Sequence, residues 1–442
     1  MGNKKERILR PAAFSAGGVF LPHLKSTAET ETVVMPPVSV VKIPLQQHIG
    51  APASPIVKVG DKVYVGTLIA EAVGFVSANI HSSVSGTVKE ISTPYGNGEC
   101  IVIESDGLME KDPNLKPFPV KKPDDFALAA EACGLVGLGG AGFPSKIKLM
   151  LKKDGPVIDT LIVNAAECEP YITSDYRECM ENYNDVIDGV YLIKDIMKID
   201  NVIICVEANK KKAIEKLYEI ATDKRDSDDH VKLMRLPTKY PQGAEKVLVN
   251  SATGRKVPLG KLPSDVGCIV MNITSIATLY RFIKTGMPLV SKRLTVDGTA
   301  VSEPKNVIVP IGTPIKDLLE FVGGIDEEAS EIMMGGPMMG NEVYTPDAVV
   351  EKRNNAITVL KTGKEKPQTP CIRCGRCVAA CPMRLFPARV ESAVNTSNME
   401  ELKTLNVFYC MECGSCSYIC PASRPLTQVM RLAKAELKKE GK

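Results

Sequence analysis

The chain repeats one cysteine spacing twice near its C-terminus, in CIRCGRCVAACP from Cys371 to Pro382 and in CMECGSCSYICP from Cys410 to Pro421. Both stretches follow the pattern C-x2-C-x2-C-x3-C-P, by which one loop wraps three irons of a [4Fe–4S] cube. The alternative is a zinc site, but zinc usually takes two C-x2-C pairs with a longer separation. Residues 370–442 are therefore predicted to form a helical domain with two clusters, which move electrons one at a time.

The fourth cysteine of each set serves the other cluster in proteins that carry two such sets. One cluster is therefore assigned to Cys371, Cys374, Cys377 and Cys420, and the second to Cys410, Cys413, Cys416 and Cys381. Nearby apolar side chains are expected to limit solvent around the clusters and to tune their potentials. These are Ile372, Val378, Phe408, Tyr409 and Ile419.

The composition indicates an ordinary soluble protein of two to four domains. The chain has 442 residues, of which 44% are hydrophobic and 24% are charged. Its net charge of +3 does not indicate binding to nucleic acid. No uncharged stretch is long enough for a transmembrane helix, and the basic N-terminus lacks the apolar core of a secretory signal, so a cytoplasmic location is expected. The remaining cysteines have no metal-ligand spacing and are predicted to be buried free thiols: Cys100, Cys133, Cys168, Cys179, Cys205 and Cys268.

The N-terminal part, residues 1–110, is predicted to be an arm followed by a small β domain. From Val38 to Glu104, short apolar runs are separated by Gly, Pro and Asn. Two segments, Val57–Ala70 and His81–Ile91, look like the halves of a biotinyl- or lipoyl-type barrel-sandwich. The hairpin between them has no lysine to carry a prosthetic arm, so a structural or docking role is expected.

Residues 120–290 alternate strand-like and helix-like patterns, which predicts an α/β Rossmann-like domain with a largely parallel sheet. The strand candidates are Thr160–Asn164, Asn201–Ala208, Val231–Pro237 and Val266–Asn272. Val186, Val190 and Ile193 share one helical face, and Lys210–Thr222 is predicted to be another helix.

A third unit, residues 291–345, has two strands, RLTVDG and NVIVPIG, followed by a helix that begins at Pro314 and ends at Gly323-Gly324. This order is typical of a small β-grasp module. Residues 346–369 are rich in Lys, Asn and Thr and are predicted to be a linker.

The final helix has an apolar stripe, which favours a helix that caps the cluster domain over a membrane anchor. The stripe consists of Leu426, Val429, Met430, Ala433 and Leu437.

A glycine-rich run, GLVGLGGAGFPSKIKL from Gly134 to Leu149, is the second candidate site. Its glycines let the backbone approach a ligand closely, and the helix that follows would offer amides to a phosphate. A purely structural turn is the alternative.

This run resembles the flavin-binding loop of the NADH-binding flavoprotein subunit of respiratory complex I. Three further segments follow in that family's order: NAAECEP (Asn164–Pro170), YPQGAEK (Tyr240–Lys246) and VMNITSIATL (Val270–Leu279). The resemblance implies contacts with FMN from Gly137, Gly139, Gly140, Gly142, Lys148, Asn164, Glu167, Asn272 and Ser275. It implies contacts with NADH from Phe143, Glu169 and Glu245.

The chain departs from complex I at Ala166, where that pattern has an acidic residue, at Cys168, where it has a serine, and in carrying two cluster sets instead of one. As a whole it resembles the C subunit of the Rnf electron-transport complex, with Gly17-Gly18, IPLQQHIGAP (Ile43–Pro52) and GGPMMG (Gly335–Gly340) in addition. That family implies a peripheral subunit on the cytoplasmic face of the cell membrane. Its expected partners are membrane and ferredoxin-like subunits of the complex, NADH, and ferredoxin indirectly.

The expected activity is that of an NADH-linked oxidoreductase subunit of an ion-translocating ferredoxin:NAD oxidoreductase. FMN would exchange hydride with NAD and pass single electrons through the two [4Fe–4S] clusters. No side chain is assigned as catalytic, and no Ser/His/Asp or HExxH arrangement supports hydrolysis. Two alternatives are a cobalamin reductase of diol utilisation, whose barrel-like unit follows the clusters, and a relay or scaffold without enzymatic activity.

Overall fold

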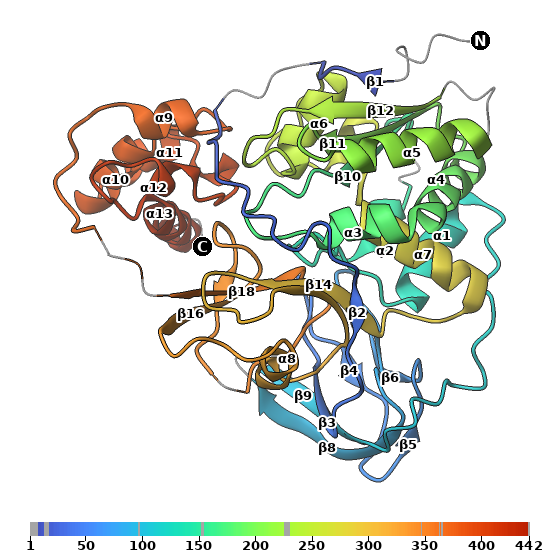
Figure 1. Ribbon diagram of the computed structural model, residues 1–442. Coiled ribbons are helices and arrows are strands. Elements are labelled where there is room, and N and C mark those ends of the chain that lie inside the picture. Colours follow the sequence, from blue (N-terminus) through green and yellow to red (C-terminus); the bar gives the residue numbers. More distant parts are fainter. Residues whose placement is uncertain are drawn as a thin grey trace.

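The fold was determined as a computed structural model, which describes residues 8–12, 17–95, 98–151, 154–224, 230–345, 347–361, 363 and 366–440. Four folded units lie around a common centre (Figure 1). An α/β domain lies at the upper right, a β domain at the bottom, a second sheet between them, and a small helical domain at the left. No helix in the described part is long and apolar enough to cross a membrane.

The α/β domain is built on a five-stranded parallel sheet in the order β1-β12-β11-β10-β13. The strands are β1 (Ile8–Leu9), β12 (Val231–Leu236), β11 (Asn201–Glu207), β10 (Thr160–Ala165) and β13 (Cys268–Asn272). One face is covered by α1 (Pro123–Ala132), α3 (Ser174–Glu181), α4 (Tyr183–Met197), α5 (Lys211–Lys224) and α7 (Ile273–Thr285), and the other by α6 (Glu245–Thr253). Since both faces are buried, the strands are continuous apolar runs, and the predicted parallel sheet is confirmed.

The order of this sheet reverses at β10, because β11 and β12 extend to one side of β10 and β13 to the other. In open parallel sheets, ligands bind beyond the carboxyl ends of the strands at such a reversal. The segments that were singled out in the sequence include these ends: Asn164 is the last residue but one of β10, and Asn272 closes β13.

The N-terminal β domain consists of two small antiparallel sheets, as predicted for a barrel-sandwich. One sheet has β3 (Val40–Pro44), β9 (Gly98–Ser105), β8 (Gly86–Tyr95) and β5 (Lys62–Val63). The other has β4 (Ser54–Pro55), β6 (Leu68–Glu71) and β7 (Ile80–His81). Both sheets bury aliphatic side chains such as Ile43, Ile69 and Ile103 in a shared core.

A six-stranded mixed sheet in the order β17-β16-β18-β14-β15-β2 forms the third unit. Its elements are β2 (Val33–Val34), β14 (Ser291–Asp297), β15 (Lys305–Pro310), α8 (Ile315–Phe321), β16 (Ala329–Met334), β17 (Asn341–Glu342) and β18 (Ala356–Lys361). The prediction of a linker over residues 346–369 is wrong for β18, which lies between β14 and β16. The reason is a short apolar segment, AITVL, whose first four residues are buried, between stretches of polar residues.

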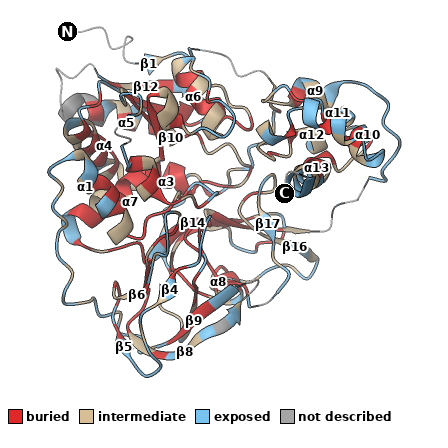
Figure 2. Cartoon of the chain, turned by 180° about the vertical axis from the view of Figure 1, so that it is seen from behind, coloured by how far each residue is buried: buried red, intermediate tan, exposed pale blue. Residues whose placement is uncertain are grey.

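The cluster domain contains α9 (Arg376–Ala380), α10 (Pro387–Asn395), α11 (Met399–Thr404), α12 (Ser415–Tyr418) and α13 (Leu426–Glu440). Met430 and Ala433 of α13 pack on Val390 and Ala393 of α10, so the final helix closes this domain as predicted. The buried residues gather in the other units, whereas long stretches of this domain are exposed (Figure 2).

The two cysteine sets adopt equivalent backbone conformations. Positive φ angles occur at the same positions of both sets: Arg373 (55°) and Glu412 (58°), Gly375 (74°) and Gly414 (79°), Arg384 (54°) and Ser423 (51°). The domain therefore repeats one loop twice with different side chains on it.

The N-terminal arm joins all of these units. It adds β1 to the parallel sheet beside β12 and β2 to the mixed sheet beside β15. Between them it passes the cluster domain, where the Gly18 amide donates to the Ala380 carbonyl at 2.6 Å. A Cβ on Gly17 would lie 2.4 Å from the Cys381 carbonyl oxygen, so the arm approaches a predicted cluster ligand in a way that only glycine allows.

Candidate redox site

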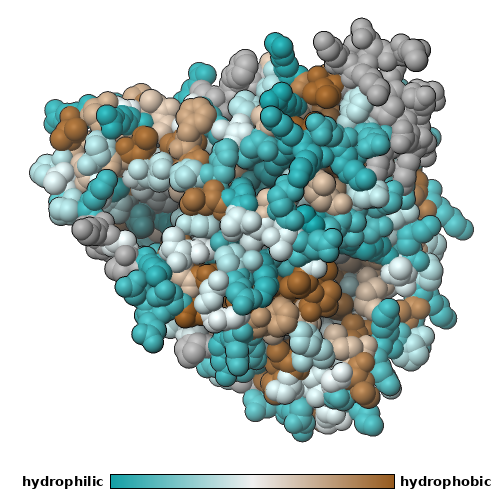
Figure 3. Space-filling view, in the orientation of Figure 1, coloured by the Kyte–Doolittle hydropathy of each residue, from teal (hydrophilic) through white to brown (hydrophobic). Residues whose placement is uncertain are grey.

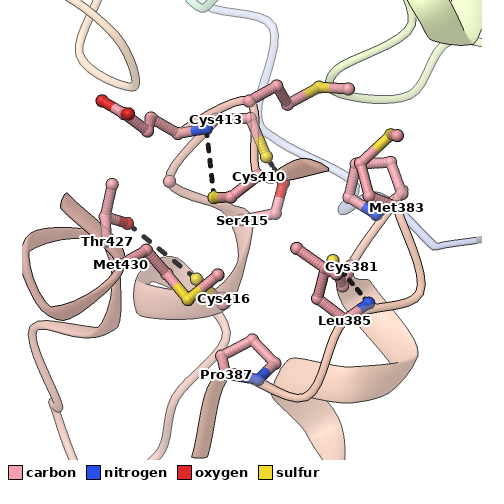
Figure 4. A pocket seen from close by; sticks show the side chains of 14 residues that line it. Cys381, Met383, Leu385, Pro387, Cys410, Cys413, Ser415, Cys416, Thr427 and Met430 are labelled. Atoms are coloured by element: carbon pink, nitrogen blue, oxygen red, sulfur yellow. Dashed lines mark hydrogen bonds between the residues drawn. The ribbon is translucent and has the colours of Figure 1, made fainter. Parts of the chain in front are cut away.

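One set of four cysteines lines an apolar cavity in the cluster domain (Figure 4). These are Cys381, Cys410, Cys413 and Cys416, the set that was assigned to one cluster from the sequence. Met383, Leu385, Pro387 and Met430 form part of the wall. The structure thus brings Cys381 from the first motif to three cysteines of the second, and we call this the inner cluster site.

Hydrogen bonds reach the sulfur atoms of the inner cluster site. The amides of Leu385 and Glu412 donate to the Sγ atoms of Cys381 and Cys410, each at 3.3 Å. Burial raises the pKa of the Cys410 thiol to about 11 and that of Cys416 to about 12. These thiols therefore bind as thiolates only when a metal compensates their charge, which fits iron ligands.

The second set lines a wider and more open cavity of about 780 Å³, which we call the outer cluster site. Its ligand set is Cys371, Cys374, Cys377 and Cys420. Cys371 and Cys374 are exposed. The expected apolar shell is not closed here, because Ile372 is 66% exposed. Phe408 does not line this site and belongs to another pocket.

The arrangement of the sulfurs differs from that of a zinc site. In the described residues, no three His, Cys, Asp or Glu side chains converge as a single metal ion requires. Zinc needs all its ligands about 2.3 Å from one point, whereas a cluster spreads its four thiolates around a cube. The cysteines line the walls of two cavities, and this geometry fits two cubane clusters.

The glycine-rich run forms a closed loop over the carboxyl ends of β10 and β13. Gly137 donates its amide to the Phe143 carbonyl at 2.8 Å, and the Leu138 amide donates to the Ser275 hydroxyl at 3.2 Å. A Cβ on Gly139 would lie 3.2 Å from the Asn272 side-chain amide. The tip, residues 139–141, is exposed.

The helix expected to offer amides after this loop is too short for that role, since α2 covers only Ser145–Leu149. Ser275 instead lies in the first turn of α7, a helix of 13 residues whose N-cap is Asn272. The long helix α7 therefore brings its positive N-terminal end to the glycine loop.

A cavity of about 280 Å³ opens beside the loop, and we call it the flavin cavity because residues that the resemblance assigns to FMN and NADH line it. Phe143, Lys148 and Glu245 line it, and the Lys148 ammonium donates to the Glu245 carboxylate at 2.6 Å. Asn164 lies next to Asn272 across the strand pair β10–β13 and binds the Gly243 carbonyl through its side chain at 2.9 Å. Most of the predicted flavin residues are thus gathered at one end of the sheet.

Ile49 was not predicted as a site residue, but it lines the flavin cavity from the barrel-sandwich domain. Its amide donates to the Gly142 carbonyl at 3.2 Å. Ile49 belongs to the segment Ile43–Pro52, which was noted for its resemblance but given no role. The only signal was therefore that motif, which by itself does not place Ile49 near a flavin.

Lys352 was also missed. Its ammonium is buried and donates to the Asn79 carbonyl at 2.5 Å and to the Gly134 carbonyl at 2.8 Å. The Lys352 amide donates to the Gln47 side chain at 3.0 Å. Lys352 therefore ties the start of the glycine loop to the barrel-sandwich domain.

Two of the predicted residues, Glu167 and Glu169, have their carboxylates engaged elsewhere. Glu167 accepts the amide of Asp175 at 2.6 Å and so caps α3. Glu169 accepts the amide of Met338 from the mixed-sheet domain at 3.0 Å. Both line a separate small pocket and not the flavin cavity, so the contacts predicted for them remain predictions without support from this geometry.

Lys25 of the N-terminal arm holds the loop that carries these two carboxylates. Its ammonium donates to the carbonyls of Glu167 at 3.1 Å and Glu169 at 2.7 Å, and also to the Ile172 carbonyl. Burial lowers the pKa of Lys25 to about 8, and burial raises that of Glu167 to about 7. The arm is therefore part of the site.

The α/β domain and the inner cluster site meet at Tyr240, which lines the small pocket of Glu167 and Glu169. This residue is 2% exposed and donates its hydroxyl to the Cys413 carbonyl at 2.6 Å. Val19 of the arm, Ala380 and Cys413 pack around Tyr240 in one apolar cluster, with Cys168 and Met338 beside it. The segment YPQGAEK thus contacts the clusters through Tyr240 and lines the flavin cavity through Glu245.

The residues present fit FMN and two [4Fe–4S] clusters. The exposed glycine tip and the N-terminus of α7 suit a phosphate, Phe143 offers a ring face, and each cluster cavity offers four thiols. FMN, when bound, would exchange two electrons with a nicotinamide and single electrons with the clusters. These features define the class of protein as a flavin- and iron–sulfur-containing oxidoreductase subunit.

Family models match all four units. They are the Nuo51 FMN-binding domain over residues 130–281, the RnfC barrel sandwich hybrid domain over 13–108, the SLBB domain over 293–342 and a 4Fe-4S dicluster domain over 364–421. The domain that was predicted as a β-grasp module is thus the SLBB domain.

Similar proteins cover nearly the whole chain. The C subunit of the proton-translocating ferredoxin:NAD(+) oxidoreductase complex of Clostridium ljungdahlii is 42% identical over 94% of this chain and 92% of that protein. The Na(+)-translocating counterpart of Acetobacterium woodii is 39% identical, over 95% and 96%. The C subunit of the ion-translocating oxidoreductase complex of Rhodobacter capsulatus is 38% identical, over 94% and 81%. The chain belongs to this family, the C subunits of ion-translocating (Rnf) oxidoreductase complexes.

Proposed function

We propose that this chain is the NAD(H)-exchanging subunit of a membrane-bound, ion-translocating ferredoxin:NAD oxidoreductase, with FMN and two [4Fe–4S] clusters as cofactors. The observation that carries the proposal is the contact between Tyr240 and Cys413, which joins the flavin domain to a cluster ligand at 2.6 Å. Such a contact brings a two-electron site within reach of a one-electron carrier.

In this proposal, the chain's residues bind and orient the reactants. Phe143 would stack against the nucleotide, while Lys148 and Glu245 hold its polar groups within the flavin cavity. The glycine loop and Ser275 would hold the flavin phosphate beside the α7 N-terminus. The N-terminal arm, Tyr240 and Met338 exclude water from the path between the flavin domain and Cys413.

The order of the cluster sites follows from their burial. Cys413 of the inner cluster site is 8% exposed and faces the flavin domain, whereas Cys371 and Cys374 of the outer site are exposed. Electrons would therefore pass between flavin and partner through the inner site first and the outer site second. The partners in this proposal are the membrane and ferredoxin-like subunits of the complex, with the chain bound peripherally at the cytoplasmic face.

The proposal is tested by reconstituting the full chain with FMN, iron and sulfide without oxygen and then adding NADH. We expect the flavin absorbance to bleach and the clusters to become reduced. Optical spectra measure the first change and electron paramagnetic resonance spectra the second. Unchanged spectra would exclude the proposed activity and leave a relay role.

A matched pair of variants on α2 assigns the activity to the flavin cavity. Lys148→Met removes a cavity residue, and Lys146→Met removes a lysine that pairs with Glu131 and does not line the cavity. Bleaching by NADH should be slowed by Lys148→Met alone.

A further inference from the structure

The two cysteine loops have the same backbone but opposite charge. The inner loop reads CMECGSC from Cys410 to Cys416, and the outer loop reads CIRCGRC from Cys371 to Cys377. Arg373 therefore stands where Glu412 stands, and Arg376 where Ser415 stands. Farther along, Arg384 and Ser423 occupy equivalent positions with φ angles of 54° and 51°.

The charge of the inner loop is compensated within the chain. Glu412 pairs with Arg431 at 2.9 Å and with Lys434 at 2.7 Å, and Ser415 is completely buried. That loop faces the flavin domain through Cys413 and Tyr240. The side chains of Glu412 and Ser415 therefore have partners or are buried within the chain itself.

The charge of the outer loop is not compensated. Residues 371–376 are all exposed, and among the described residues no carboxylate pairs with Arg373, Arg376 or Arg384. The two acidic side chains nearby are already engaged, Glu391 by Arg424 and Glu401 by Arg389, each at 2.7 Å. Two unpaired arginines, Arg373 and Arg376, thus lie beside the exposed ligands Cys371 and Cys374 in the same loop.

The same surface is concave and partly apolar. Ile372 is 66% exposed and Phe386 is 50% exposed, and both line the hollow of about 780 Å³ at the outer cluster site. Hydrophobic and hydrophilic side chains also alternate over this lobe in the space-filling view (Figure 3). An apolar centre with charged residues around it is the usual anatomy of a protein interface, in which the charges steer the partner.

We propose that the outer loop, with Arg373 and Arg376 beside Ile372 and Phe386, is the docking surface for an acidic one-electron carrier protein. The proposal rests on the function above and names the chemistry of its partner. A protein fits better than an anionic membrane, because the patch is hollow. One electron would pass from a reduced cluster here to an oxidised centre in the partner, with no proton or bond change.

The test measures binding of a recombinant acidic ferredoxin with two [4Fe–4S] clusters to the oxidised holoprotein at low and high salt. Arg373→Glu combined with Arg376→Glu should raise the dissociation constant by about 10-fold at 50 mM salt, with the difference vanishing near 0.5 M. The neutral pair Arg373→Gln and Arg376→Gln should have a smaller effect. Lys316→Glu on α8, which reverses an exposed charge outside the cluster domain, should have none.

Three outcomes would overturn the proposal: unchanged affinity in the charge-reversed variant, equal weakening by Lys316→Glu, or arginine-dependent binding to phosphatidylglycerol vesicles without binding to the ferredoxin. Iron content of each variant confirms that the clusters remain. Because binding is measured without NADH, it is independent of flavin reduction. Failure of NADH to bleach the flavin would therefore refute the proposed function, whereas ferredoxin binding that does not depend on the arginines would refute the docking surface alone.

Discussion

The hydroxyl of Tyr240 lies 2.6 Å from the carbonyl oxygen of Cys413, so a residue of the flavin domain is hydrogen-bonded to a cluster ligand. Both residues are buried, and the contact is surrounded by apolar side chains from the arm and from the SLBB domain. This bond is therefore one of the contacts that hold the cluster domain against the α/β domain, together with the bond of the Gly18 amide to the Ala380 carbonyl.

Tyr240→Phe should slow cluster reduction several-fold and leave flavin bleaching by NADH unchanged. The variant leaves the Cys413 carbonyl without a donor, which costs about 1–3 kcal/mol and loosens the junction. Tyr191→Phe is the control, since Tyr191 is also buried and donates to a carbonyl, that of Ala221 at 3.0 Å, inside the α/β domain. Stopped-flow absorbance separates the two steps, and equal slowing by both variants would contradict this role of Tyr240.

Gly17→Ala should destabilise the contact between the arm and the cluster domain. Gly17 has a φ of 74°, and its added Cβ would meet the Cys381 carbonyl oxygen at 2.4 Å. Gly107→Ala is a matched control with a φ of 75° and no atom within 4 Å of the added Cβ, so it carries only the backbone strain, about 1 kcal/mol. The melting temperature should fall further for Gly17→Ala, and only this variant should change the resonance spectrum of the inner cluster.

Lys352→Met should weaken FMN binding by about 10-fold, with both clusters retained. The change removes the donor that the Asn79 and Gly134 carbonyls share, and the start of the glycine loop then loses its anchor. Fluorescence titration of FMN measures the effect, and iron analysis shows that the cluster domain is intact. Lys316→Met, an exposed lysine of α8, should bind FMN as the natural chain does.

The parts of the fold that could be predicted from the sequence are those whose signal is local. The strand at Thr160–Ala165 is a run of apolar residues buried on both faces, and each cysteine set lies within one short segment. The exchange of Cys381 and Cys420 between sets followed from the general behaviour of paired clusters, and the cavities group the cysteines in the same way.

The parts that could not be predicted depend on contacts between domains. Ile49, Lys25 and Lys352 reach the site from the barrel-sandwich domain, the arm and the segment before β18, and no periodicity or spacing marks such contacts. β18 was mistaken for linker because its apolar segment is short and flanked by polar residues. The motif around Glu169 predicts a contact with the nucleotide. In the structure, however, its carboxylate accepts a hydrogen bond from the amide of Met338, which is far away in the sequence.

Glu169→Gln should make the protein more stable above pH 7 and leave its stability near pH 4.5 unchanged. Burial raises the pKa of Glu169 from 4.5 to about 7, so the folded chain keeps a proton that the unfolded chain has lost between these values. Stability of the natural chain therefore falls as pH rises from about 4.5 to about 7, by at most about 3 kcal/mol. Melting temperatures from pH 5 to 8 measure the difference, which should grow with pH; Glu328→Gln, an exposed control, should show none.

Cys374→Ala should remove one cluster and leave FMN and the other cluster in place. Cys374 lies in the exposed outer site, which has its own cavity and no residue in common with the flavin cavity. Half of the iron should be lost, and NADH should still bleach the flavin and reduce the inner cluster. Electron transfer to an acidic ferredoxin should be slowed strongly, because the exposed outer site is the one we propose for docking. Cys413→Ala should instead interrupt reduction of the remaining outer cluster, since it removes a ligand beside the flavin domain.

If both variants lose the flavin together with all iron, the flavin and cluster domains do not fold independently, and the order of sites proposed here is wrong.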